Sequence, residues 1–496
     1  MTHPPRPALL WLRDDLRLSD NPALCAAIAT GAPLHCVYIL DEASPGLRRL
    51  GGASKWWLHH SLQALAAALA AKGGRLDIFR GEAAPLVSSL AQACSASSVF
   101  WNRRYGQSEI ALDSGLKARL RGLGLAVQSF NSHLLHEPWQ LQTKSGGPFQ
   151  VFTPYWRAAM AQRGWPAALP APDALVAAPY PAGAPARVAL SDLALLPARP
   201  NWAKSLEPEW QPGEAGAQAR LAYFLDGGID NYSEDRNRPD LPGKSSRLSP
   251  HLRFGEISPR QIVQAAEDAA RRGQAKQGDA DKYVSEIGWR EFSYHLLYHH
   301  PDLATRNFAP RFDAFPWSDV AVALIKAWQQ GRTGYPIVDA GMRELWQTGT
   351  MHNRVRMITA SFLTKHLMAD WRIGEAWFWD TLCDADPASN PASWQWVAGS
   401  GADAAPYFRI FNPVLQGQRF DPQGAYVRRF VPELAALPDT WLHKAWEAPP
   451  DILAKAGIRL GRDYPHPVVD HAMARNRALA AFARLGEKPV DGKPGN

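Results

Sequence analysis

The sequence predicts two structural classes in one chain: an α/β domain built on a parallel sheet, followed by a domain that is nearly all helix. Over residues 1–131, short apolar runs of β type alternate with helical segments. From residue 201 onward almost every segment has helical period instead. At 496 residues the chain also exceeds what one hydrophobic core usually supports, so more than one domain is expected.

The N-terminal α/β domain is expected over residues 1–131. Its apolar β-type runs lie at residues 7–13, 34–40, 76–81, 97–102 and 125–131. Helical segments such as residues 54–73 separate these runs, and this alternation predicts a parallel sheet with helices on both faces. The turn after the first run contains no GxGxxG, so a nicotinamide dinucleotide site is not predicted.

A connector is expected over residues 132–200, because residues 165–200 are dense in proline and alanine and show little hydrophobic period. The helical domain is then expected over residues 201–485. Ser258 followed by Pro259 is typical of a helix start, with a serine N-cap and a proline in the first turn. Residues 486–496 are polar and rich in glycine and proline, which predicts a flexible tail.

Composition narrows the classes of function. The formal net charge of +7 favours a polyanionic partner, because lysines and arginines that neutralise phosphates release counterions. The four cysteines have no CxxC spacing, so an iron–sulfur or zinc site is not expected. The apolar stretches are too short or too interrupted to span a bilayer, and the first residues do not resemble a secretory leader. We therefore expect a cytoplasmic protein without a membrane partner.

Tryptophan occurs 20 times, mostly in the second half of the chain. Such large rings usually fill a helical core or anchor packing. Base stacking and electron relay are the functional alternatives.

Hydroxyl groups surround an arginine within residues 243–258. Ser245, Ser246 and Ser249 flank Arg247 in a loop that leads into helices. Backbone amides, hydroxyls and a guanidinium suit a phosphate or pyrophosphate. A capped loop between helices is the structural alternative.

One helix face within residues 281–297 carries an acid, a large ring, a guanidinium and a hydroxyl, at Glu286, Trp289, Arg290 and Ser293. A salt bridge between Glu286 and Arg290 is the simple interpretation, because a buried charge needs a partner. The functional interpretation is a ligand pocket in which Glu286 hydrogen-bonds a substrate and Trp289 stacks on it.

A helix is expected to begin near His352 and to carry Asn353, Arg356 and Met357 on one side. This pattern indicates a helix that lines a polar cleft. His352 alone is more often a structural residue than a catalyst.

Two acids, Asp384 and Asp386, lie in a loop before Asn390, and Trp394 and Trp396 follow. Paired acids can hold a metal, but this segment has no histidine or cysteine pair with ligand spacing. Hydrogen bonding to a heterocyclic cofactor fits better, and no metal site is predicted.

Several motifs occur in an order that resembles that of DNA photolyases and cryptochromes. They are LRDDLRLSDNPAL at residues 12–24, RLSPHLRFGEIS at 247–258, WREF at 289–292, TGYPIVDAGMREL at 333–345, MHNRVRM at 351–357, DAD at 384–386 with WQW at 394–396, and DAAPYFRIFNP at 403–413. The match spans most of the chain. The segment GWREFSYHLLYHHPDL at residues 288–303 looks closest to the bacterial class III photolyases that act on cyclobutane pyrimidine dimers.

The resemblance implies a Rossmann-like antenna domain joined by a long connector to a helical FAD-binding domain. It assigns to the phosphates and sugar of FAD the residues Tyr232, Ser245, Ser246, Arg247, Leu248 and Ser249. It places Glu286 and Arg290 on the binding helix. It also assigns four residues to the surroundings of the ribityl and isoalloxazine groups, namely Arg356, Asp384, Asp386 and Asn390. Asn390 is expected to face the redox-active ring nitrogen, where plant cryptochromes carry an aspartate.

The lesion pocket implied by the resemblance consists of Glu286, Trp289, Asn353, Met357 and Trp396. The six-four photolyases carry histidines where Asn353 and Met357 stand, so the resemblance favours cyclobutane dimers in UV-damaged DNA as the substrate. The dimer must leave the base stack, and its damaged geometry lowers that cost. The residues implied to engage DNA phosphates are Arg236, Arg354 and Arg409.

The implied reaction is electron transfer: excited, fully reduced FAD donates an electron to the dimer, the cyclobutane ring splits and the electron returns. Trp394, Trp371 and Trp317 resemble the relay that photoreduces oxidised FAD. Asn102 and Glu109 stand where binders of the antenna 5,10-methenyltetrahydrofolate carry polar contacts, with deazaflavin or a second flavin as alternatives. Thr350 departs from the pattern, because many relatives carry an aromatic residue there.

The resemblance therefore predicts a monomeric photolyase that repairs cyclobutane pyrimidine dimers in DNA. A cryptochrome shares the fold and the flavin, but Asn390, the pair of Asn353 and Met357 and the short tail argue against it. Repair of the six-four lesion is a second alternative. A light-independent flavin or nucleotide-binding protein is the third, because fold does not dictate function.

Overall fold

A computed structural model describes residues 5–404 and 408–485. The chain divides into two compact units: the first contains residues 1–234, 243–301 and 380–387, and the second contains 235–242, 302–379 and 388–496. The domain limits expected from the sequence stay a prediction. The predicted tail at 486–496 lies outside the described residues.

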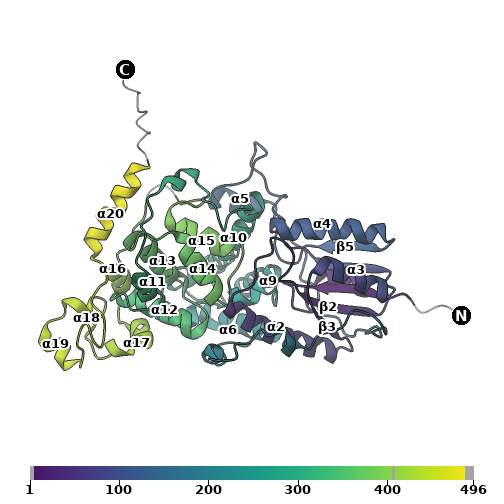
Figure 1. Cartoon of the computed structure of the whole chain (residues 1–496), viewed down its shortest axis with the longest axis horizontal. Coiled ribbons are helices and arrows are strands. Elements are labelled where there is room, and N and C mark those ends of the chain that lie inside the picture. Colours follow the sequence, from purple (N-terminus) through teal and green to yellow (C-terminus); the bar gives the residue numbers. More distant parts are fainter. Residues whose placement is uncertain (1–4, 405–407, 486–496) are drawn as a thin grey trace, which may run out of the picture. The chain divides into compact units, whose positions relative to one another are not determined.

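The first unit contains the predicted parallel sheet (Figure 1). Its strands are ordered β3-β2-β1-β4-β5, and each neighbouring pair is parallel. The strands are β1 (Ala8–Leu12), β2 (Leu34–Leu40), β3 (Leu76–Arg80), β4 (Ser98–Asn102) and β5 (Ala126–Phe130). The polar residues that follow β1 and β4 therefore meet at one edge of the sheet, as the carboxyl ends of parallel strands do.

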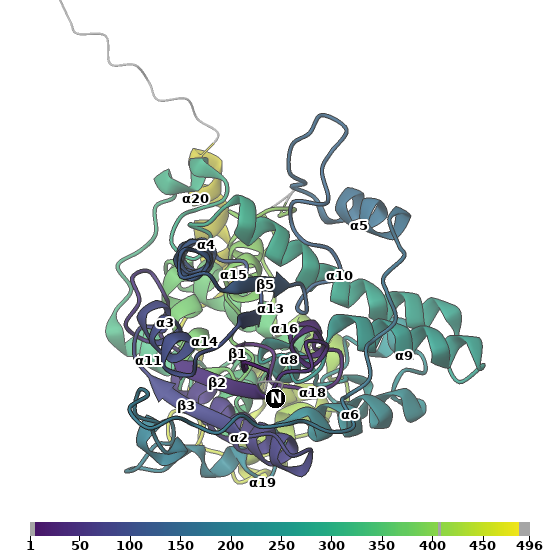
Figure 2. The ribbon, with the colours of Figure 1, turned by 90° about the vertical axis from the view of Figure 1, so that its right-hand side faces the viewer.

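Helices cover both faces of this sheet, as predicted. They are α1 (Pro22–Ile28), α2 (Gly52–Ala71), α3 (Ala83–Ala93) and α4 (Gln107–Gly122). Leu10 of β1 belongs to a core shared with α1 and α2, whereas its neighbour Trp11 belongs to a core shared with α3 and α4. In Figure 2, α2 lies on one side of the strands, and α3 and α4 lie on the other.

The rest of the first unit is mainly helical. Within residues 132–200 the helices are α5 (Phe152–Ala161) and the short 3₁₀ segment Leu190–Leu193. The later helices are α6 (Glu214–Tyr223), α7 (Tyr232–Asp235), α8 (Ser249–Arg253), α9 (Pro259–Arg271) and α10 (Gln277–His299). The predicted start of α9 is confirmed, because the Ser258 side chain accepts a hydrogen bond from the amide of Gln261 and Pro259 occupies the first turn.

In the second unit the regular structure of the described residues is almost entirely helical, as predicted. The α-helices are α11 (Val322–Gln329), α12 (Pro336–Thr348), α13 (Asn353–Ser361), α14 (Trp371–Thr381), α15 (Ser389–Ala398), α16 (Pro413–Phe420), α17 (Ala425–Phe430), α18 (Asp439–Leu442), α19 (Pro450–Lys455) and α20 (His471–Arg484). Helix α20 packs through Ala478 and Ala481 against a core that includes Phe312 and Phe408. Across the described part of the chain, no helix has both the length and the hydropathy that a bilayer span requires.

Candidate functional site

The serine-rich loop of the first unit leads directly into α8. Leu248 is the buried one of its predicted ligand residues. The other four are partly or fully exposed, namely Ser245, Ser246, Arg247 and Ser249. Arg247 has a φ of 52°, which is uncommon for a residue with a side chain. Its guanidinium lies 4.2 Å from the centroid of the Trp210 ring and 3.2 Å from a carboxylate oxygen of Glu209. The loop thus presents hydroxyls beside a cation of fixed orientation, a donor set that suits a phosphate.

The turn that carries Tyr232 is fixed by Asp279 of α10. The Asp279 carboxylate accepts hydrogen bonds from the amides of Ser233, at 2.8 Å, and Asn231, at 3.1 Å. Burial raises the pKa of Asp279, but these hydrogen bonds outweigh burial and hold it below its usual value. The Tyr232 ring packs edge-on against Tyr283, with centroids 5.3 Å apart. Its position is therefore fixed by the core.

Trp289 projects from α10 and is half-buried. Its ring stacks on that of Phe152 in α5, with centroids 3.8 Å apart and planes 9° apart. Phe152 thereby holds the indole in one plane. A rigid, partly exposed indole of this kind can serve as a wall for a flat apolar ligand.

The two charged residues of this helix face, Glu286 and Arg290, each contact a different partner. Glu286 lies 2.9 Å from the ammonium of Lys282, one helical turn away. Arg290 donates a hydrogen bond to the carbonyl of His133 at 2.7 Å and lies 3.6 Å from Glu291. Both charged side chains therefore have partners other than each other, and a salt bridge between Glu286 and Arg290 stays a prediction.

The loop with the two predicted cofactor acids is buried and tightly held. Asp384 and Asp386 are both buried, and Asp386 accepts a hydrogen bond from the Tyr294 hydroxyl at 2.7 Å. Arg253 donates to the carbonyl of Ala385 at 2.8 Å, which fixes the backbone between the acids. Buried carboxylates suit a ligand with several hydrogen-bond donors, such as the ring N–H and hydroxyl groups of a flavin nucleotide.

In the second unit, Asn390 is oriented by a buried glutamate. Its side-chain amide donates to the Oε1 of Glu375 at 2.9 Å and to the carbonyl of the same residue at 3.1 Å. Both side chains are buried. Because the amide nitrogen is used in this way, the carbonyl oxygen of Asn390 is the atom of this side chain that could accept a hydrogen bond from a ligand.

The three predicted relay tryptophans lie in different surroundings. Trp394 is buried, and its ring centroid lies 4.9 Å from that of Phe378 and 6.2 Å from that of Trp328. Trp371 is buried and donates from Nε1 to Asn307 at 2.9 Å. In a separate cluster, Trp317 is half-buried, and its ring centroid lies 4.4 Å from that of Phe315.

Gly374 explains how α14 approaches Trp394 so closely. A Cβ atom at this glycine would overlap the indole of Trp394. Any side chain there would therefore displace the ring that is predicted to begin the relay.

The helix predicted to begin near His352 does so, because α13 starts at Asn353 with His352 as its N-cap. The His352 ring accepts a hydrogen bond from the amide of Arg354 at 3.2 Å. Burial, with Arg354 and Arg356 nearby, lowers the pKa of His352 to about 4. The neutral ring can therefore accept this bond, which agrees with a structural role.

Asn353 is exposed and Met357 half-buried on the same helix. Arg356 donates from Nε to the carbonyl of Met351 at 2.7 Å, and it also reaches the hydroxyl of Thr350 at 3.4 Å. Thr350, the residue that departs from the family pattern, thus contacts a predicted cofactor residue.

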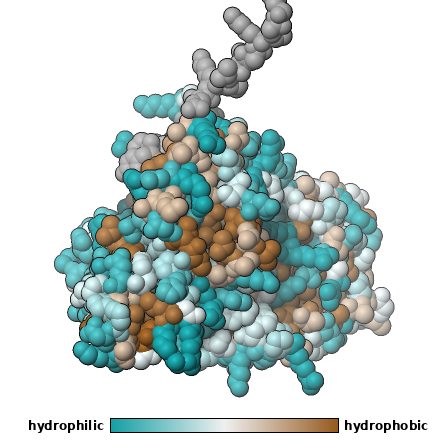
Figure 3. All heavy atoms as spheres, turned by 60° about the vertical axis from the view of Figure 1, so that its left-hand side comes forward, coloured by the Kyte–Doolittle hydropathy of each residue, from teal (hydrophilic) through white to brown (hydrophobic). Residues whose placement is uncertain are grey.

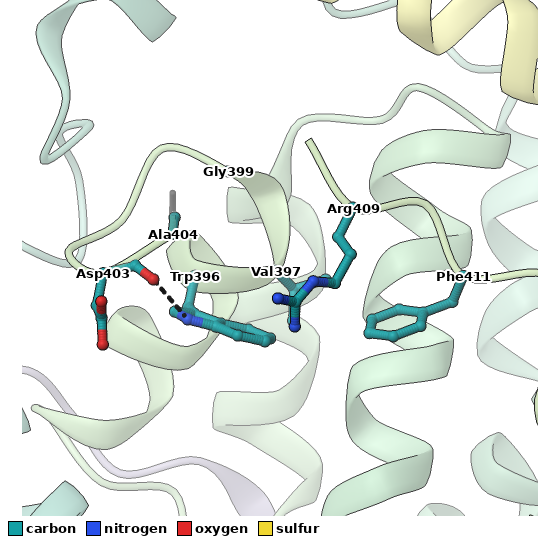
Figure 4. A pocket seen from close by; sticks show the side chains of 7 residues that line it. All are labelled: Trp396, Val397, Gly399, Asp403, Ala404, Arg409 and Phe411. Carbon is teal, nitrogen blue, oxygen red and sulfur yellow. Dashed lines mark hydrogen bonds between the residues drawn. The ribbon is translucent and has the colours of Figure 1, made fainter. Parts of the chain in front are cut away.

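Trp396 lines a small hollow at the C-terminal end of α15 (Figure 4). Its Nε1 donates to the carbonyl of Asp403 at 3.1 Å, and the Arg409 guanidinium lies 5.6 Å from its ring centroid. In Figure 4 the Arg409 side chain extends between Trp396 and Phe411. An aromatic wall and a cation therefore line the same hollow.

Arg354 in the second unit lies near three other arginines, and we call these four residues the arginine cluster: Arg236, Arg354, Arg409 and Arg419. Burial and the charges of the other three lower the pKa of Arg354. Arg354 also donates to Asn237 at 2.8 Å and lies 4.6 Å from the Phe420 ring centroid. Like charges that are held together in this way favour a polyanion.

The two predicted antenna residues lie in the first unit. Asn102 is buried at the end of β4, and its amide donates to Asp15 at 2.6 Å and to Asn21 at 2.7 Å. Glu109 lies in the first turn of α4, and its charge helps to keep the pKa of Arg104 raised although burial lowers it. Asn102 therefore has partners within the protein, and its role toward an antenna stays a prediction.

Within each unit the chain brings some predicted residues together. In the first unit, α10 carries Glu286 and Trp289. The same helix also contacts Asp386, through the hydroxyl of Tyr294. In the second unit, the arginine cluster joins three predicted residues. Sequence reasoning missed Arg419, Glu375, Tyr294 and Phe152. A basic residue next to Phe420 was a signal for Arg419, whereas long-range partners such as Phe152 leave no local pattern.

Comparison with known proteins gives consistent findings over most of the chain. Residues 283–484 match the family described as the FAD binding domain of DNA photolyase, and residues 8–173 match the family described as DNA photolyase. The chain is 53% identical to a deoxyribodipyrimidine photo-lyase from Agrobacterium fabrum, over 97% of this chain and 98% of that protein. It is 36% identical to cryptochrome-1 of Arabidopsis thaliana, over 96% of this chain and 70% of that protein.

Solved structures include similar folds. A bacterial class III photolyase from Agrobacterium tumefaciens superposes with a TM-score of 0.93 at 52% identity, over 98% of this chain and 99% of that one. The fold predicted from the sequence is thereby confirmed.

Proposed function

The chain belongs to the DNA photolyase and cryptochrome family, and we propose that it uses light to split cyclobutane pyrimidine dimers in DNA. Its FAD-binding domain holds the cofactor that this reaction uses. The proposal includes action as a monomer in the cytoplasm.

The observation that carries the proposal is the combination of an aromatic wall with a cluster of cations in the second unit. Arg409 lies beside Trp396 in one hollow, and Arg354 and its arginine neighbours lie in the same electrostatic cluster. Phosphate contacts position a nucleic acid, and aromatic surfaces receive bases that have left the stack. A protein that merely bound flavin would need neither feature.

The residues present fit FAD in their chemistry. In the first unit we assign the hydroxyls and guanidinium of the loop at 245–249 and the hydroxyl of Tyr232 to the phosphates and sugar. Also in the first unit, Asp384 and Asp386 supply buried carboxyl groups, and Arg290 supplies a partly buried guanidinium. In the second unit we assign Arg356 and the carbonyl oxygen of Asn390, which Glu375 orients.

The chemistry that bound, reduced FAD supplies is light-driven donation of one electron to the dimer and its recovery after the cyclobutane ring has split. The side chains bind and orient the lesion. Trp289, held flat by Phe152, and Trp396, held by Asp403, act as apolar walls. Glu286, whose carboxyl group lies 2.9 Å from the ammonium of Lys282, is proposed to hydrogen-bond the lesion.

Asn353 and Met357 of α13 are proposed to contact the lesion, and their amide and thioether do not offer the acid and base chemistry of histidines. Trp394, Trp371 and Trp317 are proposed to carry electrons to oxidised FAD. Asn102 and Glu109 are proposed to contact 5,10-methenyltetrahydrofolate as the antenna.

The direct test uses three oligonucleotides that carry a cyclobutane dimer, a six-four lesion or no damage. We expect reduced, illuminated protein to restore the cyclobutane dimer alone, as measured by chromatography of the products. Restoration of the six-four lesion alone would replace the proposed substrate. Tight flavin binding without repair of either lesion would favour a cryptochrome, whose 36% identity to this chain makes it the competing assignment.

A further inference from the structure

Apolar patches interrupt the hydrophilic surface on the face shown in Figure 3. Among the described residues of the second unit, the exposed large apolar side chains are Val322, Trp346, Ile373, Leu415 and Met473. Trp346 has the largest ring system among these side chains, and 51% of its surface is exposed. An aromatic ring of this size on a surface often marks a binding site.

Trp346 lines a hollow of about 510 Å³ formed by α11, α12 and α14. Its ring is stacked on that of Trp377, with centroids 6.1 Å apart and planes 7° apart. The two indoles come from different helices, so each restricts the rotation of the other. The hollow has the size of a site for one small molecule.

Polar groups surround this pair of rings. Three side-chain amides line the hollow, at Gln329, Gln330 and Gln347. Two cations line it as well, Lys326 and Arg343, and none of the described residues that line it is a carboxylate. Arg343 is bound to the carboxylate of Glu433 at 2.7 and 2.9 Å, and this carboxylate balances its charge. The ammonium of Lys326 is therefore the better placed of the two cations to pair with an anionic ligand.

We propose that this hollow binds a free mononucleotide. The base stacks on Trp346, because every base has a flat π-face that suits an indole. The amide side chains meet the nitrogen and oxygen atoms at the edge of the base, since each amide both donates and accepts hydrogen bonds. The phosphate pairs with the ammonium of Lys326.

This chemistry selects among ligand classes. A purely apolar ligand would leave three amides and a cation without partners. An inorganic anion would use Lys326 but would leave the indole exposed. A mononucleotide has a flat ring, edge heteroatoms and an anion in one molecule, and its size suits the volume. The site is independent of the proposed repair reaction, because its residues have no assigned part in FAD or lesion binding.

The test is a titration of FAD-loaded protein with adenosine monophosphate, followed by saturation-transfer NMR and by tryptophan fluorescence. FAD occupies the cofactor site during the titration, so adenosine monophosphate cannot report on that site. We expect Trp346→Ala to raise the Kd at least about tenfold, in line with the loss of one stacked base. Lys326→Glu should raise the Kd for adenosine monophosphate but leave that for adenosine nearly unchanged.

Matched control variants separate this site from the rest of the surface. Leu415→Ala removes another exposed apolar side chain, and Lys455→Glu reverses another exposed charge, so both should bind as the wild type does. Gln347→Ala gives a second variant at the hollow that does not disturb the stacked rings. The proposal is overturned if adenosine monophosphate does not bind at millimolar concentration. It is also overturned if Trp346→Ala binds like the wild type, or if Arg354→Ala alone abolishes binding.

Discussion

The Tyr294 hydroxyl donates a hydrogen bond to Oδ2 of Asp386 at 2.7 Å, and both side chains are buried. The same hydroxyl lies 2.8 Å from Nε2 of His133. Burial, with Arg290 nearby, lowers the pKa of His133 well below its usual value, so the ring is neutral. One hydroxyl thus connects helix α10 to the acidic loop and fixes the direction in which the Asp386 carboxylate faces.

Tyr294→Phe should weaken the binding of FAD about tenfold or more. The variant removes one hydrogen bond to a buried charged group, which is typically worth about 1.5–3 kcal/mol. Without this bond the Asp386 carboxylate loses its fixed direction. The measurement is a titration of the apoprotein with FAD, followed by the quenching of flavin fluorescence.

Tyr298→Phe is the matched control, because Tyr298 lies one turn further along α10 and its ring contacts Trp139 and His299. We expect this variant to bind FAD like the wild type. Equal affinities for all three proteins would show that the contact between Tyr294 and Asp386 does not position the cofactor.

Trp394→Phe should slow the photoreduction of oxidised FAD at least about tenfold, while repair by chemically reduced protein should remain nearly unchanged. Photoreduction needs the relay, whereas repair begins from flavin that is already reduced. Trp328→Phe is the comparison, because the Trp328 ring packs edge-on against Trp394. Unchanged photoreduction in Trp394→Phe, measured by flavin absorbance under blue light, would remove this residue from the relay.

Arg354→Ala and Arg419→Ala should each weaken the binding of DNA with any sequence and lower the salt slope by about 1. Each removed guanidinium leaves one phosphate without its counter-charge. Arg462→Ala is the control, since this arginine is exposed outside the cluster. Fluorescence anisotropy at several salt concentrations measures the slope, and a slope that stays constant in Arg354→Ala would contradict a phosphate contact.

The raised pKa of Glu291 predicts that the stability of the protein falls as the pH rises. Burial raises the pKa of Glu291 to about 7, from 4.5 in the absence of the fold, although Arg290 and the amides of His136 and Leu135 lower it. Between pH 4.5 and pH 7 the folded protein binds more protons than the unfolded chain. The contribution of Glu291 to the free energy of unfolding is therefore full below about pH 4.5, and it is lost as the pH rises through 7. The total change is at most about 3 kcal/mol.

Glu291→Gln should therefore gain stability over the wild type as the pH rises from 5 to 8. Glutamine keeps an oxygen for the two backbone amides but cannot ionise. The comparison is the difference in Tm between variant and wild type at each pH, with the exposed Glu447→Gln as a control. A difference in Tm that does not change with pH would contradict a raised pKa at Glu291.

The fold could be predicted from the sequence because its signals are local. The five apolar runs gave the parallel sheet, and Ser258 with Pro259 gave the start of α9. The cap at His352 was likewise a local signal for α13. Such patterns depend on residues a few positions apart, which interact within one strand or one helical turn.

The partners of the candidate site residues could not be predicted, because they come from distant segments. Spacing on α10 suggested a pair between Glu286 and Arg290, but it gave no sign that Glu286 contacts Lys282 or that Arg290 contacts the backbone of His133. Glu375 orients Asn390 from a different helix. Contacts of this kind depend on tertiary packing, and a single sequence contains no periodic signal for them.

The central claim is tested most directly by placing a single defined thymine dimer in an oligonucleotide and adding the FAD-loaded, reduced protein. Half of the sample is illuminated with blue light, and the other half is kept dark. We predict that intact thymines are recovered in the illuminated half alone, with repeated turnover by each protein molecule. Dimers that persist under illumination in a sample that has bound both FAD and the oligonucleotide would contradict repair as the function of this protein.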